Sequence, residues 1–208
     1  MFIVIDGPNG SGKTTLINKL KANGNITLSS PKETPLSTML RPACRGTSPW
    51  EDIDPRIQFM LFSAARFDEY VRIVMPAPYS EKIYADRWWT STYVYQCMLQ
   101  GISVDFMEHT IHPQEQLDLV LLLDADNEVL SKRLLVERDI NPAHGKCSWT
   151  KEMDTVYRLA DMYRNELRHY LTSKGICNLR VDVTNSTTDE VYNHVLETVE
   201  AISLKGVV

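Results

Sequence analysis

The chain has 208 residues, of which 43% are hydrophobic, and a formal net charge of −5 at pH 7, an acidic balance that argues against a dedicated nucleic-acid binder with its usual basic stripe. The hydrophobic content is sufficient for the core of one α/β domain, and no Pro/Gly/Ser-rich linker divides the chain, so we expect one domain over residues 1–208. The four cysteines are scattered, and the sequence shows neither a signal peptide nor a membrane-length apolar run, so we expect a cytoplasmic protein without a membrane partner.

Five short apolar runs, in chain order, predict five β-strands. They are Phe2–Ile5 ending at Asp6, Ile26–Ser29, Lys82–Ala85 ending at Asp86, Leu117–Leu123 ending at Asp124, and Ile176–Val183. Runs that are almost continuously apolar and alternate with helical segments are typical of a parallel sheet that helices cover on both faces. The sequence therefore predicts a doubly wound α/β fold.

A clear helix signal lies at Asp54, an N-cap residue that is followed by Pro55 at the first helical position. Apolar residues then recur at helical spacing, which predicts a long helix. These residues are Ile57, Met60, Leu61, Ala64, Phe67, Val71 and Val74.

Two further helices are predicted in the second half of the chain. One covers about Lys151–Ser173 and stops at Gly175, and its tyrosines, including Tyr163, are interpreted as packing residues because they have core spacing. The other helix opens with Thr187 and Glu190, which have the spacing of a capping box. Strands and helices therefore alternate to the end of the chain.

A phosphate-binding loop with the complete pattern G-x4-G-K-[ST] lies at Gly7–Thr14, directly after the first strand and before an expected helix. This context lets backbone N–H groups and a helix N-terminus face the phosphates of a nucleotide. Lys13 is expected to reach the β- and γ-phosphates of ATP, and the Thr14 hydroxyl is expected to bind Mg²⁺. The other positions expected to contact ATP are Gly7, Asn9, Gly10, Ser11, Gly12 and Thr15.

A phosphate-binding loop alone does not separate GTPases, motor ATPases and small-molecule kinases. The guanine-recognition pattern Asn-Lys-x-Asp is absent from the sequence, and the apolar strand that ends at Asp124 is not followed by the Asp-Glu pair of motor ATPases. The dipeptide Asp86-Arg87 at the end of the third strand points instead to a kinase.

Four segments, in order and over nearly the whole chain, resemble the thymidylate kinase family. They are Phe2–Thr15, Leu61–Arg66, Asp86–Gln96, and Gln116–Asp124 followed by Val129–Arg133. The third segment is the most specific, because family members carry Asp-Arg, then Ser, then Tyr-Gln at the same offsets. The resemblance implies a P-loop NTPase fold with five parallel strands in the order 2-3-1-4-5. It also implies transfer of the γ-phosphate of ATP to dTMP with Mg²⁺, and a homodimer.

The resemblance implies roles for individual residues. Phe62 is expected to stack on the pyrimidine, and Arg66, on the same helix face, to donate hydrogen bonds to a thymine carbonyl. Arg87 is expected to clamp the acceptor phosphate, with Asp86 close to the metal and the attacking oxygen. Tyr95 is expected to leave no room for a ribose 2′-hydroxyl. The other expected acceptor contacts are Asp6, Pro31, Lys32, Arg41, Ser91, Thr92 and Gln96.

Simpler interpretations of these residues stay open. From periodicity alone, Phe62 is a core residue and Arg66 a solvated charge, and Asp86 is an N-cap of the following helix. Arg133, Arg138 and Lys146 lie in a polar stretch before the long helix. The resemblance implies a mobile lid there, at about residues 137–151, and basic residues that close over the ATP phosphates, with Arg133 as a further expected ATP contact. Arg138 is the candidate catalytic residue of this lid, and a solvated charge is the alternative for each of the three.

Three positions depart from the family pattern on the acceptor side, and one of them is Trp88-Trp89, which is bulkier than usual directly after Asp86-Arg87. Asn9 stands where many members have an acidic residue, and Ser29 stands where bacterial members have an arginine, whose contact Lys32 is expected to replace. A kinase for dUMP or a modified deoxypyrimidine monophosphate is therefore an alternative, because one methyl group discriminates only roughly 10- to 200-fold. A deoxynucleoside kinase with Glu33 as its base, and a non-catalytic nucleotide-binding protein, are the other two alternatives.

Overall fold

The computed structural model describes residues 1–44, 53–110, 117–140 and 153–204, and within these residues five parallel strands form one sheet. The strands are β1 (Phe2–Asp6), β2 (Ile26–Ser29), β3 (Ile83–Asp86), β4 (Leu119–Asp124) and β5 (Asn178–Asp182). Their spatial order is β2-β3-β1-β4-β5, which confirms the predicted order, and every strand lies within two residues of its expected bounds.

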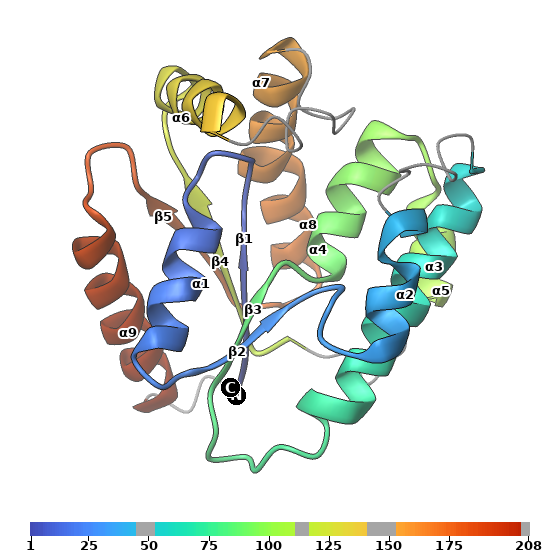
Figure 1. Cartoon of the computed structure of the whole chain (residues 1–208), viewed down its shortest axis with the longest axis horizontal. Helices are drawn as coiled ribbons and strands as arrows, with labels where there is room; N and C mark the ends of the chain where they lie inside the picture. The colour runs from blue at the N-terminus through green and yellow to red at the C-terminus, as the bar shows by residue number, and fades with distance from the viewer. Residues whose placement is uncertain (45–52, 111–116, 141–152, 205–208) are drawn as a thin grey trace.

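Helices cover both faces of the sheet, and the central strands β1 and β4 are buried at every position, whereas the edge strands β2 and β5 are partly exposed. Figure 1 shows α1 (Lys13–Ala22) and α9 (Thr188–Leu204) together on one side of the sheet. The remaining helical segments are α2 (Pro35–Cys44), α3 (Pro55–Glu69), α4 (Trp89–Thr92), α5 (Val104–Thr110), α6 (Asn127–Ile140), α7 (Met153–Met162) and α8 (Arg168–Ser173), with π-helical turns η1 (Tyr70–Val74), η2 (Tyr93–Leu99) and η5 (Tyr163–Leu167). In the part of the chain that the structure describes, none of these helices is long and apolar enough to cross a bilayer.

Alternate residues of β1 enter two separate cores. Ile3 and Ile5 pack in a cluster with residues of α1 and α9, whereas Phe2 and Val4 pack on the opposite face with residues of α3, η2 and η5. All of β1 is therefore buried. The central strand is fixed in register by both cores, and its carboxyl end brings Asp6 to the edge of the sheet where α/β proteins bind ligands.

The helix after Asp54 is confirmed, because the Asp54 carboxylate accepts a hydrogen bond from the Arg56 N–H at 2.8 Å. However, the apolar spacing that predicts this helix belongs largely to its outer side, since Ile57 is 51% exposed and Met60 is 50% exposed. The side that faces the interior is more polar. Its buried residues are Gln58, Phe59, Ser63, Ala65, Arg66 and Glu69.

The last helix begins as predicted. The Thr187 N–H donates to Oε2 of Glu190 at 2.8 Å, and the Glu190 N–H donates to Oγ1 of Thr187 at 3.3 Å. These reciprocal hydrogen bonds form a capping box that satisfies two N–H groups at the start of α9. Because α9 packs on one face of the sheet and buries Val191, Val195 and Val199 in its core, the cap at its N-terminus contributes to the stability of the fold.

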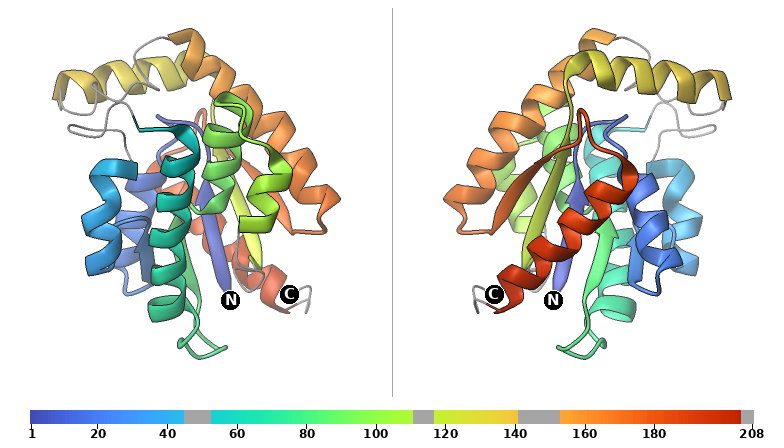
Figure 2. Two further views of the ribbon diagram at one scale, coloured as in Figure 1. Left: turned by 90° about the vertical axis from the view of Figure 1, so that its right-hand side faces the viewer. Right: turned by 90° about the vertical axis from the view of Figure 1, so that its left-hand side faces the viewer.

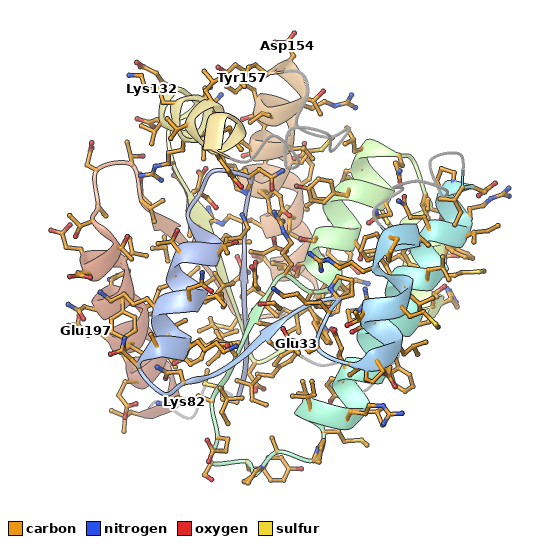
Figure 3. The ribbon with its side chains drawn as sticks, viewed as in Figure 1. Glu33, Lys82, Lys132, Asp154, Tyr157 and Glu197 are labelled. Atoms are coloured by element: carbon orange, nitrogen blue, oxygen red, sulfur yellow. The ribbon has the colours of Figure 1, made fainter. Side chains whose placement is uncertain are left out.

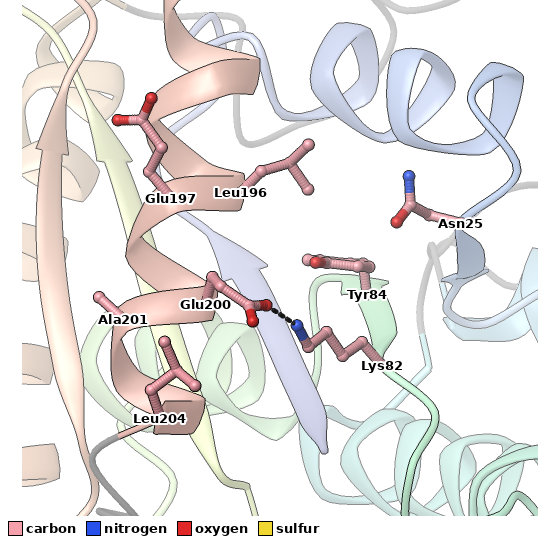
Figure 4. Close-up of a pocket in the computed structure, with 8 residues that line it drawn as sticks. All are labelled: Asn25, Lys82, Tyr84, Leu196, Glu197, Glu200, Ala201 and Leu204. Carbon is pink, nitrogen blue, oxygen red and sulfur yellow. Dashed lines mark hydrogen bonds and ion pairs between the residues drawn. The ribbon is translucent and has the colours of Figure 1, made fainter.

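A cavity of about 620 Å³ lies at the amino ends of β2 and β3, beside the C-terminal part of α9 (Figure 4). Leu196 and Leu204 contribute apolar walls, and an ion pair of 2.5 Å between Lys82 and Glu200 lies at its side. This edge of the sheet is opposite to the one at which the phosphate-binding loop begins. The cavity is therefore not where a doubly wound sheet places its substrate.

Replacing Thr187 with alanine is expected to lower the free energy of unfolding by about 1 kcal/mol, because the Glu190 N–H loses its acceptor. Urea denaturation followed by circular dichroism measures this change. The matched control is Thr188→Ala, since the Thr188 side chain is exposed at the first position of α9. Equal losses in the two variants would contradict the capping role.

Candidate active site

The phosphate-binding loop joins β1 to α1 at the carboxyl edge of the sheet, and its glycines permit contacts that no side chain allows. Gly7 has φ +141°, and a Cβ there would lie 2.1 Å from the Leu123 carbonyl oxygen. Gly10 has φ +83°, and a Cβ there would lie 2.9 Å from the Leu130 carbonyl oxygen on α6. The loop is therefore held closely between β4 and α6, which crosses the end of the sheet above it (Figure 2).

Lys13, the first residue of α1, is buried within this loop. Its Nζ donates hydrogen bonds to the Pro8 carbonyl oxygen at 2.6 Å and to Oγ of Ser11 at 3.2 Å. Burial lowers the pKa of Lys13 to about 7, and the positive charge of Arg87 acts in the same direction. The Lys13 amine is therefore only partly charged near pH 7, and a further anion beside it would favour the charged form.

Asp6 at the end of β1 is fully buried and accepts four kinds of donor. The Gly7 N–H donates to it at 2.8 Å, and the Thr90 hydroxyl donates at 2.5 Å. The Ser91 hydroxyl lies 2.9 Å away, and Arg87 forms an ion pair of 3.1 Å. The carboxylate thereby orients Arg87 and Ser91, and its expected direct contact with substrate stays a prediction.

Arg87 has φ +69°, a rare conformation for a side-chain-bearing residue that is typical of functional sites. Its guanidinium donates to Oδ1 of Asn9 at 2.7 Å and to the Tyr163 hydroxyl at 3.0 Å, and it lies over the Tyr95 ring at 5.7 Å. Burial alone would lower the pKa of Arg87, but Tyr95, Tyr163 and Asp6 outweigh it and hold that pKa well above its usual value. Arg87 is therefore permanently charged and held in a fixed orientation beside the phosphate-binding loop, and its expected contact with the acceptor phosphate stays a prediction.

Tyr163 lies in the site, although its spacing in the sequence predicts a packing residue. It is 2% exposed, its hydroxyl lies 3.0 Å from both Arg87 and Ser91, and burial together with Asp6 raises its pKa well above the usual value. The hydroxyl therefore stays protonated and helps to orient the guanidinium. No local pattern distinguishes such a tyrosine from a core residue at the same helical spacing.

Thr14 and Asp86 face each other across the start of α1 and the end of β3. The Thr14 hydroxyl donates to Oδ2 of Asp86 at 3.4 Å, and both residues retain solvent exposure. A hydroxyl and a carboxylate beside a phosphate site are the oxygen ligands that suit Mg²⁺, which usually keeps several waters and binds substrate phosphates. No cluster of three His, Cys, Asp or Glu side chains occurs among the described residues. The pair therefore fits Mg²⁺ shared with a phosphate better than an all-protein metal cage.

The expected base-binding residues also meet. Arg66 on α3 is 3% exposed and donates to Oγ1 of Thr92 and to Oγ of Ser63, each at 3.2 Å. Gln96 is buried in the adjoining η2, and Phe62 is half-buried one turn before Arg66. A buried guanidinium on this face rules out the solvated charge that periodicity alone would allow. Its specific contact with a base stays a prediction.

The segment between β2 and α2 carries the remaining acceptor-side residues. Pro31 is buried, with a cis peptide bond to Ser30, and its carbonyl oxygen accepts a hydrogen bond from NH1 of Arg41 at 2.9 Å. Lys32 is exposed, and Oε1 of Glu33 accepts the Ser29 N–H at 3.0 Å. Figure 3 shows Glu33 in this loop. Arg41 on α2 thus supports this loop through its hydrogen bond to Pro31.

Arg133 lies on α6 and not in a loop, which corrects the sequence-based interpretation. Leu130 and Leu134 are buried four residues apart, so this apparently polar stretch has an apolar side that holds it as a helix. NH2 of Arg133 donates to the Val183 carbonyl oxygen at 3.0 Å, and NH1 donates to the Gly10 carbonyl oxygen at 3.5 Å. Arg133 therefore lies directly against the phosphate-binding loop.

Arg133 also lines a cavity of about 200 Å³ between the loop and the start of α9. The other lining residues are Ser11, Gly12, Thr15, Leu16, Val183, Ser186, Thr188 and Val191. The predicted lid at about residues 137–151 lies mostly outside the described residues, as do Lys146 and the side chain of Arg138. Their expected roles stay predictions.

Comparisons with known proteins identify the family of this chain. The family model of thymidylate kinase matches residues 5–177. The thymidylate kinase of Acinetobacter baylyi is 34% identical over 112 residues, which are 50% of this chain and 55% of that protein, so the match spans only about half of its length. The thymidylate kinase of Staphylococcus epidermidis is 31% identical over 147 residues, or 64% of this chain and 69% of that protein.

Solved structures show the same fold. A thymidylate kinase from Candida albicans superposes with a TM-score of 0.72 at 21% identity, covering 97% of this chain and 92% of that one. A thymidylate kinase from Ehrlichia chaffeensis gives a TM-score of 0.67 at 18% identity, covering 96% of this chain and 98% of that one. With the family model matching most of its length, the chain belongs to the thymidylate kinase family.

Proposed function

We propose that this chain transfers the γ-phosphate of ATP to dTMP, giving ADP and dTDP, and that it does so in the cytoplasm. The observation that carries the proposal is the position of Arg87. Its guanidinium is bound to Asn9 of the phosphate-binding loop at 2.7 Å and to the buried Asp6 at 3.1 Å. A second anion-binding group thus stands directly beside the first, as transfer between two phosphates requires.

The chain contributes positioning and charge neutralisation to this reaction. A phosphate oxygen of dTMP attacks the γ-phosphorus of ATP, the bond from that phosphorus to the β-bridging oxygen breaks, and ADP leaves. Lys13 binds the donor phosphates and Arg87 binds the acceptor phosphate, so like charges approach each other between two cations. Thr14 and Asp86 would hold Mg²⁺, which neutralises charge on the phosphate oxygens when it is bound.

A few contacts bear on which base is preferred and on the alternative functions. Arg66 is buried between α3 and α4, where a guanidinium donates well to a carbonyl oxygen of thymine. The nucleoside kinase alternative needs Glu33 as a base, and the Glu33 carboxylate instead accepts the Ser29 N–H at 3.0 Å. The non-catalytic alternative finds no support in a site where Lys13, Arg87 and the Thr14–Asp86 pair all stand together.

The test is ADP release from MgATP with dTMP, dUMP, 5-substituted dUMPs, dCMP and thymidine in parallel. We expect the highest kcat/KM with dTMP. Arg66→Ala is expected to raise the KM for dTMP roughly 10- to 100-fold, because a buried hydrogen bond from a charged group is lost. Arg56→Ala is the control, since Arg56 lies exposed at the start of the same helix and pairs with Asp54.

Each other result of this panel identifies a different function. Turnover of thymidine alone would identify a nucleoside kinase, and preference for another monophosphate would identify a different base. Binding of MgATP without turnover of any acceptor would identify a non-catalytic protein. An unchanged KM in Arg66→Ala would remove that residue from base recognition.

Binding of MgATP is expected to take up about one proton per chain at about pH 8 and much less at about pH 6. The pKa of Lys13 is about 7, so its amine is largely neutral at the higher pH and largely charged at the lower one. Phosphates beside it favour the charged form and raise its pKa, so apparent ATP affinity falls as pH rises above 7. Calorimetric titration in buffers of different ionisation enthalpy measures the uptake. Equal uptake at the two pH values would exclude Lys13 as its source.

We further propose that the protein is a homodimer that associates through the outer sides of α2 and α3. These two helices pack side by side (Figure 1) and expose large apolar side chains. The exposed residues are Leu36 at 37%, Met39 at 68%, Ile57 at 51% and Met60 at 50%. Apolar groups gathered on one face are typical of a protein interface, and a second copy is the partner that presents the same face.

Met60→Glu is expected to convert a dimer of two 23.8 kDa chains into a monomer, because it places a charge in the apolar contact. Light scattering after size-exclusion chromatography measures the mass. Tyr79→Glu is the matched control, since Tyr79 is fully exposed in the segment before β3. A wild-type monomer, or an unchanged mass in Met60→Glu, would contradict this interface.

A further inference from the structure

The loop between β2 and α2 is bound by side chains of the neighbouring helices at Pro31, Lys32 and Glu33. The Pro31 carbonyl oxygen accepts from Arg41 at 2.9 Å, and the Lys32 carbonyl oxygen accepts from Oγ1 of Thr38 at 3.1 Å. Both donors lie on α2. The register of β2 with β3 places Ser29 opposite Asp86, so this loop begins beside the candidate acceptor site.

Glu69, the last residue of α3, binds backbone N–H groups of the same loop. Its Oε1 accepts the Lys32 N–H at 2.7 Å and the Glu33 N–H at 2.8 Å. The residue is 0% exposed, and its Oε2 has no hydrogen-bond partner among the described residues. A carboxylate that accepts two backbone N–H groups makes strong, charge-assisted hydrogen bonds, but burying it with one oxygen unpaired has a substantial energetic cost.

The position of Glu69 on α3 connects this loop to the base-binding residues. Phe62, Arg66 and Glu69 are separated by four and then three residues, so they lie on one face of the helix. The helix rises about 10 Å from the first to the last of them. One rigid element therefore carries the two residues expected to recognise the base and the carboxylate that holds the loop expected to meet the phosphate.

We infer that Glu69 is a positioning residue for the acceptor: it fixes the loop so that Lys32 faces the acceptor phosphate at a set distance from the base held by Phe62 and Arg66. This inference rests on the proposed function. Glu69 itself touches no substrate and acts through the two N–H groups that it accepts. Lys32 thereby replaces the arginine that bacterial members carry at the position of Ser29. A single lysine on a fixed loop presents a point charge in a defined place.

Amide hydrogen exchange and kinetics on the full-length protein test the inference. In Glu69→Ala, the Lys32 and Glu33 N–H groups are expected to exchange at least about 10-fold faster. The KM for dTMP is expected to rise by about 10-fold or more, while the KM for ATP stays within about twofold, because the loop is on the acceptor side only. Glu69→Gln keeps an oxygen acceptor without the charge, and its effects are expected to be intermediate.

The control is Glu108→Ala, which removes a glutamate whose partners, Tyr170 and Lys174, lie away from this loop. Unchanged exchange at Lys32 and Glu33, or equal increases in both KM values, would overturn the positioning role. If Glu69→Ala does not fold, Glu69→Gln decides, and wild-type exchange and kinetics in that variant would overturn the inference. The exchange measurement needs no substrate, so it tests the hold on the loop even if the wild-type chain does not phosphorylate dTMP.

Discussion

The arrangement of the site depends on one buried negative charge, the carboxylate of Asp6. An isolated carboxylate in a protein interior is strongly unfavourable, so its surroundings must supply donors. They come from three separate places: the Gly7 N–H in the phosphate-binding loop, Arg87 after β3, and the Thr90 and Ser91 hydroxyls at α4. The phosphate-binding loop and Arg87, which we propose to bind the donor and acceptor phosphates, are thereby fixed to the same carboxylate, and the unusual φ of Arg87 is held in place.

A second constraint is that α3 buries charged residues and exposes large apolar ones. Its interior side carries Arg66 and Glu69, and its outer side carries Ile57 and Met60. Arg66 donates to Thr92 on α4, and Glu69 accepts from the Lys32 N–H, whereas the exposed apolar groups belong to the side that we propose as a protein interface. Phe59 of the same helix is fully buried in the core with Phe2 and Val4, so the interior side of α3 combines core packing with buried polar groups.

Much of the fold follows from local signals in the sequence. The five strands, the loop at Gly7–Thr14 and the capping box at Thr187 depend on patterns within a few residues, and all three are confirmed. The strand order, in contrast, is implied by the family resemblance, and it is confirmed as well. Tyr163 meets Arg87 across 76 residues of sequence, so its spacing alone indicates packing. Glu69 looks like a surface residue beside other charged residues, and only the fold of the distant Lys32 segment buries it. What the sequence does not predict are the contacts created by tertiary structure.

The close approach of α6 to Gly10 has a mechanical consequence. The Leu130 carbonyl oxygen occupies space that a Cβ at position 10 would fill, so two backbones touch with no side chain between them. Side chains can absorb small movements by changing rotamer, whereas contacting backbones transmit them directly. A shift of α6 at the end of the sheet therefore displaces the phosphate-binding loop directly. A movement of the loop displaces α6 in the same way.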